Sequence, residues 1–268
     1  LTKILLNTFK KFPEFNLAKK VYLYEQSDLL KKIQRNNISN KNVKWIKNFE
    51  KIIDGPVIFF GNEFFDAIPI KQFKKNSNLF LEKNYILNKN NNIVEIFKKA
   101  SYSDIKLIKS YKALKNLKFI EFPKIGFKEL EKISYKISKL KGCILLVDYG
   151  YLKSQNKDTL QSVIRHRKNK LLNNLGDADV TSHVNFELLK EFFIKNNLRV
   201  KKITTQRKFL ENIGILKRAE ILAKKMKFTD QSNLYLRLRR LLNPKLMGEI
   251  FKVILAYDCD KSSFIGFK

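Results

Sequence analysis

Cysteine, proline and long apolar runs are scarce in this sequence, and each scarcity excludes a class of structure. Two cysteines among 268 residues, Cys143 and Cys259, cannot build a disulfide framework or a zinc site. Five prolines and nine glycines form no linker-like stretch, so nothing marks a second independent domain. Apolar runs stay well below the roughly 18 residues of a membrane span, and residues 1–6 do not fit a signal peptide.

Acidic residues are also scarce: 25 Asp and Glu stand against 55 Lys and Arg, which gives a net charge of +30. Such an excess suggests nucleic acid or an anionic surface as a partner. However, 46 of the basic residues are Lys, nine are Arg, and 26 residues are Asn. Proteins that bind phosphates and bases favour Arg, because its guanidinium donates two parallel hydrogen bonds. We therefore favour the interpretation that the lysines form a solvated surface and reflect a biased amino-acid composition. Nucleic acid stays possible but is not favoured.

Apolar runs alternate with helix-like periodicity along the chain, which predicts an α/β fold in one domain over residues 1–268. Residues 70–98 alternate differently and predict a β-meander insert, while residues 152–185 form a long polar loop near the predicted active site. The other predicted strands lie at 21–24, 43–46, 56–60, 143–147, 200–205 and 249–257. The predicted helices lie at 2–12, 28–34, 102–117, 127–140, 186–196 and 209–242, the last broken near Gly214 and Thr229.

Three of the predicted strands end in polar or acidic residues: Glu25, Asn62-Glu63 and Asp148. In an open α/β sheet, ligands bind outside the carboxyl ends of the strands. A carboxylate such as Glu25 suits a ribose because it can accept hydrogen bonds from both hydroxyls. The alternative is that these residues are simply solvated strand ends. We expect Glu25, Asn62, Glu63 and Asp148 to converge at one rim.

The segment Gly61–Pro69 places an amide and two carboxylates, Asn62, Glu63 and Asp66, directly after a buried strand. Phe64 and Phe65 are expected to anchor this loop. A plain alternative is a capped helix start, in which Asp66 merely satisfies backbone donors. We favour a functional loop.

Six ordered segments, beginning with this loop, resemble the conserved blocks of the MidA family of S-adenosyl-L-methionine (SAM) dependent methyltransferases, which includes the mitochondrial complex I assembly-factor arginine methyltransferase. The loop resembles the family's asparagine–glutamate–aromatic–phenylalanine–aspartate–alanine–leucine–proline signature. The other segments are Leu145–Tyr151, Asp158–Gln161 with Arg165–Arg167, Asp177–Phe186, Thr205–Ile215 and Met247–Val253.

The resemblance implies a class I Rossmann-like SAM methyltransferase sheet with the meander insert and extra C-terminal helices. It implies SAM as cofactor, no metal, and arginine methylation of a respiratory complex I subunit. Glu63 and Asp66, or Asp148, would hold the guanidinium, with Tyr149 stacked on it. Glu25 would bind the SAM ribose, and Asn62 would line the cofactor pocket.

Two features depart from the family pattern. The glycine-rich SAM loop and first strand are expected upstream of Leu1, so this chain would lack them. Asn185 stands where the family usually has aspartate.

Two histidines complete the candidate site. Arg165, His166 and His183 are predicted to bind the substrate; alternatively, His183 pins the long loop onto Asp177 or Asp179. An RNA methyltransferase and a non-catalytic assembly module remain the competing functions. The expected location is the bacterial cytoplasm, or the mitochondrial matrix if the source is eukaryotic.

Overall fold

The structure is a computed structural model that describes residues 2–38, 40, 42–77, 79–165, 167–260 and 263–268. It forms two compact units, Leu1–Asp54 and Gly55–Lys268. The single domain predicted over residues 1–268 therefore stays a prediction. None of the helices in the described ranges is long and apolar enough to cross a membrane.

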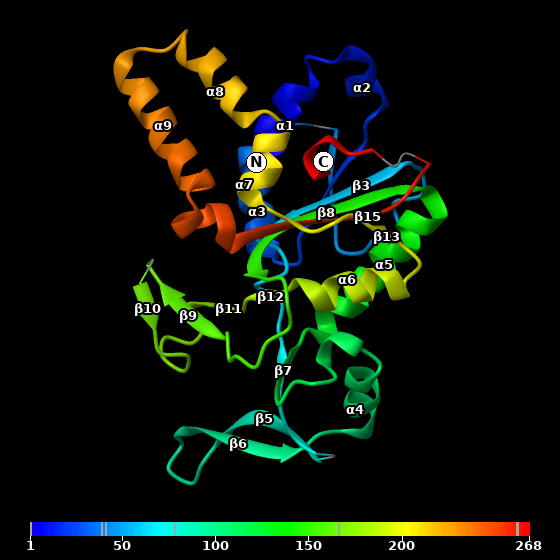
Figure 1. Cartoon of the computed structure of the whole chain (residues 1–268), viewed down its shortest axis with the longest axis vertical. Helices are drawn as coiled ribbons and strands as arrows, with labels where there is room; N and C mark the ends of the chain where they lie inside the picture. The colour runs from blue at the N-terminus through cyan, green and yellow to red at the C-terminus, as the bar shows by residue number, and fades with distance from the viewer. Residues whose placement is uncertain (1, 39, 41, 78, 166, 261–262) are drawn as a thin grey trace. The chain divides into compact units, whose positions relative to one another are not determined.

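The first unit is built around two parallel strands and a helix that connects them (Figure 1). Val21 pairs with Val43 and Tyr24 with Ile46. The connecting helix begins where predicted, because the Ser27 hydroxyl accepts a hydrogen bond from Leu30 N at 3.3 Å. The elements are α1 (Thr2–Phe9), α2 (Pro13–Ala18), β1 (Val21–Tyr24), α3 (Asp28–Asn37) and β2 (Val43–Ile46).

The second unit is organised by a sheet with β8 (Gly142–Tyr151) at its centre. β3 (Val57–Asn62) runs parallel to one edge of β8, and β15 (Phe251–Asp258) runs antiparallel to the other. All three strands lie in segments that the sequence predicted as strands. The prediction of a fully buried strand is wrong for β3, because Ile58 is 72% and Phe60 47% exposed. β15 extends the sheet with β13 (Arg199–Val200) and β14 (Thr204–Thr205). β12 (Val184–Asn185) pairs in parallel with the end of β8.

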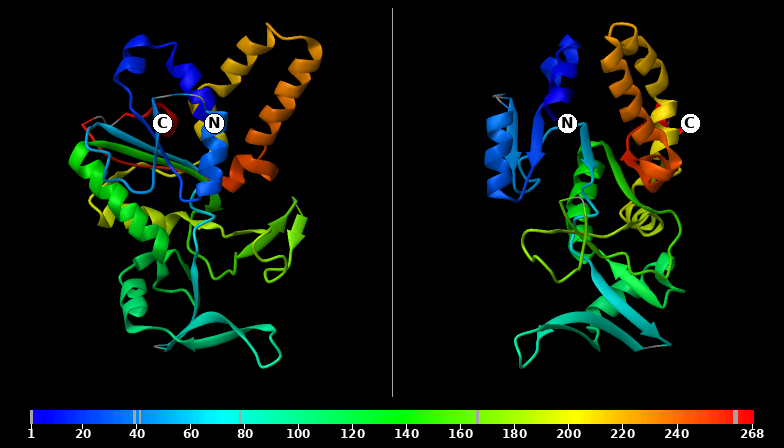
Figure 2. Two further views of the ribbon diagram at one scale, coloured as in Figure 1. Left: turned by 180° about the vertical axis from the view of Figure 1, so that it is seen from behind. Right: turned by 90° about the vertical axis from the view of Figure 1, so that its left-hand side faces the viewer.

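Helices α5 (Lys124–Leu140), α6 (Phe186–Lys195) and α7 (Gln206–Asn212) pack against this sheet. α5 buries Phe127, Leu130, Ile133 and Ile137, four of the five residues that its sequence period placed on one face. α8 (Ile215–Ala223) and α9 (Phe228–Leu242) form a hairpin that reaches away from the sheet in all three views (Figures 1 and 2). η2 (Pro244–Gly248) leads into β15, and η3 (Ile265–Phe267) follows it.

A four-stranded antiparallel sheet lies within the same unit. β4 (Lys71–Asn76), β5 (Leu79–Leu87) and β6 (Ile93–Lys99) lie in the segment for which a meander was predicted, and β7 (Phe119–Phe122) joins the other side of β4. The helix predicted over 102–117 is wrong in extent: α4 (Tyr102–Lys109) ends early, followed by η1 (Lys112–Leu114). β7 was not predicted.

A buried carboxylate ties this sheet to the helices beside it. Asp104 of α4, 2% exposed, accepts hydrogen bonds from Lys124 of α5 at 2.6 Å and Lys71 of β4 at 2.9 Å. Burial alone would raise the pKa of Asp104, but the hydrogen bonds from Lys124, Lys71 and Ser101 outweigh it and hold the pKa at about 2.

The segment predicted as a long loop over residues 152–185 contains a small sheet of its own. β9 (Gln161–Ile164) pairs with β10 (Arg167–Asn169) on one side and β11 (Asp179–Thr181) on the other. The segment then joins the main sheet through β12, directly against Gly150. A Cβ atom at Gly150 would overlap the carbonyl oxygen of Val184, so only glycine permits this close pairing.

Candidate functional site

The loop after β3 begins with a strained residue. Asn62 pairs with Val147 of β8, and Glu63 N donates to Val147 O at 3.0 Å, which extends the pairing by one residue. Glu63 is exposed and has a φ of 48°, in the left-handed region that disfavours residues with a side chain. The Asn62 amide donates to Glu63 Oε1 at 3.2 Å. Backbone strain of this kind concentrates at functional sites.

Asp148 holds the same loop in place by accepting hydrogen bonds from its backbone. It is 2% exposed, and its Oδ2 accepts hydrogen bonds from Phe65 N at 2.9 Å and Asp66 N at 3.2 Å. Its Oδ1 accepts from Tyr149 N at 2.9 Å. Burial and the charge of Asp66 raise the pKa of Asp148 to about 7, although these three donors oppose the shift. The structure therefore gives Asp148 a positioning role, and its contact with a substrate stays a prediction.

Asp66 and Tyr149 form a buried pair across the loop. The Tyr149 hydroxyl donates to Asp66 Oδ2 at 2.5 Å, and burial together with this bond raises the pKa of Tyr149. Asp66 is only 6% exposed, yet its Oδ1 atom has no hydrogen-bond partner among the described residues. A buried carboxylate oxygen without a donor is unfavourable, so this atom needs a donor that the described residues do not supply.

The segment 152–185 reaches this pair at Ser182 and His183. Ser182 N donates to Asp66 O at 3.0 Å, and the His183 ring packs edge-on against Tyr149 at 5.4 Å. Burial, with a smaller contribution from Lys157, lowers the pKa of His183, so its ring is neutral at neutral pH. His183 N donates to the Thr159 hydroxyl at 3.0 Å. His183 thus contacts Thr159 and Tyr149.

Sequence analysis did not single out Glu121 of β7. This carboxylate is 8% exposed and accepts hydrogen bonds from Thr159 N at 2.9 Å, the Thr159 hydroxyl at 2.5 Å and Gln72 at 2.8 Å. Because Thr159 in turn accepts from His183 N, Glu121 fixes the segment that carries His183. The short, mostly apolar run Phe119-Ile120-Glu121-Phe122 before a proline was a weak local signal for the missed strand.

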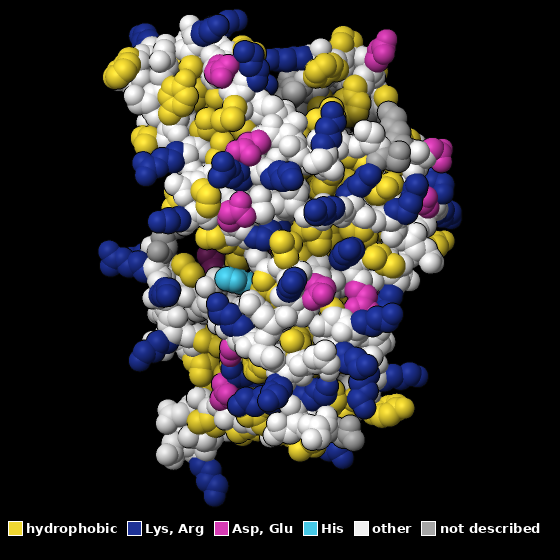
Figure 3. All heavy atoms as spheres, viewed as in Figure 1, with side chains coloured by type: hydrophobic (Ala, Val, Ile, Leu, Met, Phe, Trp, Pro, Cys, Tyr) yellow, Lys and Arg dark blue, Asp and Glu magenta, His cyan; other side chains and the backbone are white. Residues whose placement is uncertain are grey.

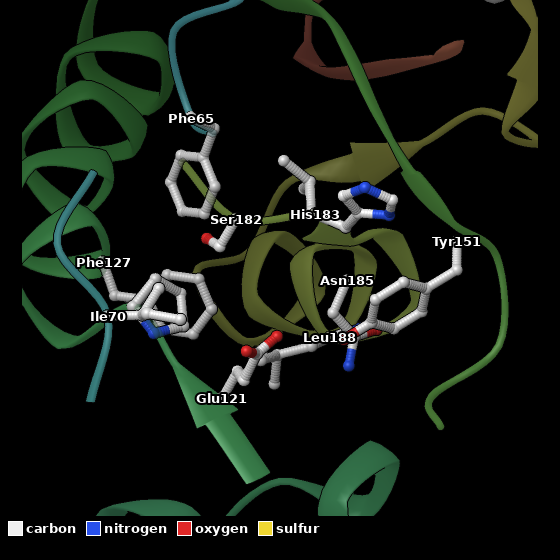
Figure 4. Close-up of a pocket in the computed structure, with 11 residues that line it drawn as sticks. Phe65, Ile70, Glu121, Phe127, Tyr151, Ser182, His183, Asn185 and Leu188 are labelled. Atoms are coloured by element: carbon white, nitrogen blue, oxygen red, sulfur yellow. The ribbon is translucent and has the colours of Figure 1, made fainter. Parts of the chain in front are cut away.

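Glu121 and His183 line the same small cavity, together with the aromatic rings of Phe65, Phe127 and Tyr151 (Figure 4). The cavity measures about 20 Å³, which is room for about one water molecule. Burial and the nearby Glu121 raise the pKa of Tyr151. This mixture of aromatic walls and one carboxylate lies beside the loop that carries Asp66.

Glu25 lies in the first unit, directly after β1. Its Oε1 accepts from Ser27 N at 2.9 Å and its Oε2 from the Gln34 amide at 2.8 Å, while Gln34 accepts from the Trp45 indole at 2.9 Å. The carboxylate is therefore held in one orientation and still has lone pairs for the hydroxyls of a ribose. Its convergence with Asn62, Glu63 and Asp148 stays a prediction.

Of the remaining predicted substrate contacts, the structure describes Arg165, which directly follows β9. Arg165 is exposed there with a φ of 49°. His166 lies outside the described residues. Their contact with a substrate stays a prediction.

Comparison with known proteins defines the class to which this fold and site belong. The model of a family described as "Putative S-adenosyl-L-methionine-dependent methyltransferase" matches residues 1–204, more than half of the chain. The chain therefore belongs to this family of SAM-dependent methyltransferases, which confirms the resemblance seen in its sequence and SAM as the family's cofactor.

Two curated relatives carry names that are more specific than the description of the family. The chain is 32% identical over 179 residues to "Protein arginine methyltransferase NDUFAF7 homolog, mitochondrial" of Caenorhabditis elegans. It is 27% identical over 210 residues to "Protein arginine methyltransferase NDUFAF7, mitochondrial" of Danio rerio. These alignments cover 65% and 78% of this chain, but 41% and 49% of the relatives. The chain thus spans at most about half the length of these two proteins.

A solved structure has the same fold. It is a COG1565 superfamily member from Burkholderia thailandensis bound to S-adenosyl-homocysteine, with a TM-score of 0.79 and 18% sequence identity. The match covers 99% of this chain and 71% of that chain. The predicted α/β class is confirmed as a mixed α/β fold.

Proposed function

We propose that this chain is part of a methyltransferase that transfers the methyl group of SAM to an arginine of another protein, a respiratory complex I subunit or assembly intermediate. The names of the curated relatives support the arginine acceptor. The parallel strands β1, β2, β3 and β8 support a class I Rossmann-like organisation. A reducing compartment, the bacterial cytoplasm or the mitochondrial matrix, is the proposed location.

The unpartnered Oδ1 atom of Asp66 carries the proposal. A guanidinium keeps its charge in proteins and donates up to five hydrogen bonds in a planar fork, so it needs carboxylate acceptors. Asp66 Oδ1 supplies a buried acceptor, and Glu63 supplies a second carboxylate three residues earlier. Tyr149, whose hydroxyl is fixed on Asp66, presents an aromatic ring in the same place.

The residues available to the cofactor have suitable chemistry. Glu25 would hold the ribose hydroxyls, because its carboxylate is oriented by Ser27 and Gln34 and retains acceptor capacity. Asn62 would line the pocket. When bound, SAM supplies a methyl group already activated by its sulfonium, so the protein mainly has to align the acceptor nitrogen and remove its proton.

The chain's own residues would perform these two tasks. Asp66 Oδ1 and Glu63 would accept hydrogen bonds from the guanidinium and turn one nitrogen toward the methyl group. The proton released on methylation would pass to one of these carboxylates. Asp148 would keep the loop in place from beneath, through its bonds to Phe65 N and Asp66 N.

Replacing Glu63 by Gln in the full-length enzyme tests the proposal. We expect at least a hundred-fold loss of methyl transfer to a protein acceptor, because an oriented carboxylate is lost. SAM affinity, measured by calorimetry, should stay unchanged. Glu14→Gln, at another exposed glutamate, in α2, is the matched control and should keep full activity. Unchanged turnover in Glu63→Gln would remove Glu63 from the acceptor site, and no SAM binding by the parent enzyme would favour a non-catalytic module.

A further inference from the structure

The hairpin of α8 and α9 exposes apolar side chains that the proposed methyl transfer does not use. All fifteen residues of α9 are described and none is buried, while α8 buries only Ala219 and Ala223. The turn between them is nevertheless well held, because the Gln231 amide donates to Ala223 O and Met226 O, both at 3.1 Å. The space-filling view shows hydrophobic side chains open at the surface in this part of the unit, beside Lys and Arg (Figure 3).

The tip of the hairpin, residues 221–228, combines large apolar and basic side chains. Ile221 is 54% exposed, Leu222 36% and Phe228 82%. Lys224, Lys225 and Lys227 are exposed among them, and the tip contains no acidic residue. Single exposed apolar residues are ordinary, but three within eight positions at the end of a protruding hairpin form a patch.

The hairpin also carries four arginines away from its tip, and no basic residue stands between Lys227 and Arg237. Arg237, Arg239 and Arg240 are exposed on α9, and Arg218 on α8. These are four of the nine arginines in the chain. The basic residues of the hairpin thus include a larger share of arginine than those of the whole chain. A composition biased toward lysine explains this arginine content less well.

We propose that the tip of the α8–α9 hairpin docks the protein on an anionic phospholipid surface. Ile221, Leu222 and Phe228 would enter the boundary between headgroups and acyl chains, as the apolar faces of interfacial helices do. The three lysines would lay their aliphatic stems along that boundary and keep their ammonium groups at the lipid phosphates. The hairpin would lie at the membrane surface.

Sedimentation with lipid vesicles tests this docking in the intact chain. We expect binding to vesicles of phosphatidylcholine and phosphatidylglycerol in equal amounts, and little binding to phosphatidylcholine alone. Each Lys→Gln change at 224, 225 or 227 should weaken binding about five-fold, and Phe228→Ser about ten-fold or more. Tyr102→Ser in α4, where Tyr102 is 81% exposed, is the matched control and should bind like the parent. If Phe228→Ser and Tyr102→Ser lost vesicle binding to the same extent, the proposal would be overturned.

A fluorescent reporter at the tip separates membrane docking from other partners. Phe228→Trp should be quenched by brominated phospholipids, whereas Tyr102→Trp should not, with the parent supplying the background of its single tryptophan, Trp45. Absence of quenching at residue 228 would contradict insertion. Binding to RNA that does not depend on Phe228, or self-association lost in Phe228→Ser without vesicles, would instead assign the tip to nucleic acid or to a second copy of the chain.

Discussion

Two neighbouring aspartates of the site differ in how their oxygens are satisfied. Asp148 accepts three backbone hydrogen bonds, while Asp66 accepts one from Tyr149 and leaves its Oδ1 free of donors among the described residues. A carboxylate whose oxygens bind the backbone shapes a loop, and one with an open oxygen can receive a ligand. Sequence analysis predicted that both Asp66 and Asp148 are catalytic, and their hydrogen bonds now distinguish the two residues.

The raised pKa of Asp148 predicts a pH-dependent stability. The pKa rises from about 4 in the unfolded chain to about 7 in the folded protein, so the folded state binds more protons between these values. The free energy of unfolding should therefore fall as pH rises from about 4 to about 7, by up to about 4 kcal/mol. Below about pH 4 both states are protonated and the contribution is constant.

Urea denaturation of the parent and Asp148→Asn across this window measures the effect. The variant should lose stability at every pH, because an amide cannot accept from all three backbone donors. Its slope with pH between about 4 and about 7 should nevertheless be flatter than that of the parent, since the titrating group is gone. Parallel slopes would show that Asp148 titrates normally.

At the scale of secondary-structure elements, Asn185 explains one departure from the family pattern. Its Oδ1 accepts from Leu188 N at 3.1 Å and caps α6, and its amide donates to the Ser154 hydroxyl at 3.0 Å. Asparagine and aspartate cap helices about equally well, so the cap survives without the charge. We expect Asn185→Asp to change stability by less than about 0.5 kcal/mol and Asn185→Ala to lower it by about 1 kcal/mol. Thermal unfolding of both variants measures these changes in stability. If Asn185→Asp and Asn185→Ala lost equal stability, the result would argue against a capping role for Asn185.

The elements that sequence could predict are those with a strong local pattern. β3, β8 and β15 are continuous apolar runs, and α5 carries a clear helical period. β7 was missed because it has only four residues and exists by pairing with β4, whose partner residues lie 45 to 51 positions earlier. No local sequence pattern records such a pairing. Its Glu121 was missed for the same reason. Glu63, Asp66, Asp148 and Tyr149 could be named because they sit at strand ends within family blocks, whereas the orphaned oxygen of Asp66 required coordinates.

At the scale of the whole molecule, the net charge of +30 is spread rather than gathered. Figure 3 shows Lys and Arg side chains over much of the visible face, interspersed with acidic and hydrophobic ones. A minority of the lysines are also paired, for example Lys71 with Asp104 and Lys83 with Asp158. A scattered, partly neutralised charge suits a solvated surface better than a continuous track for phosphates.

The dependence of activity on salt decides between a protein and an RNA acceptor. An enzyme that neutralises six to ten phosphates releases their counterions, and its affinity falls by about 10³ to 10⁵ between about 50 and 200 mM salt. An arginine held by Glu63 and Asp66 involves one or two short contacts, one of them with a buried carboxylate, which salt screens weakly. We therefore expect the KM of the full-length enzyme for its protein acceptor to change less than about ten-fold over this range. If RNA is methylated and the logarithm of its affinity falls steeply and linearly with the logarithm of the salt concentration, the acceptor is nucleic acid. The proposed SAM binding would be unaffected by that result.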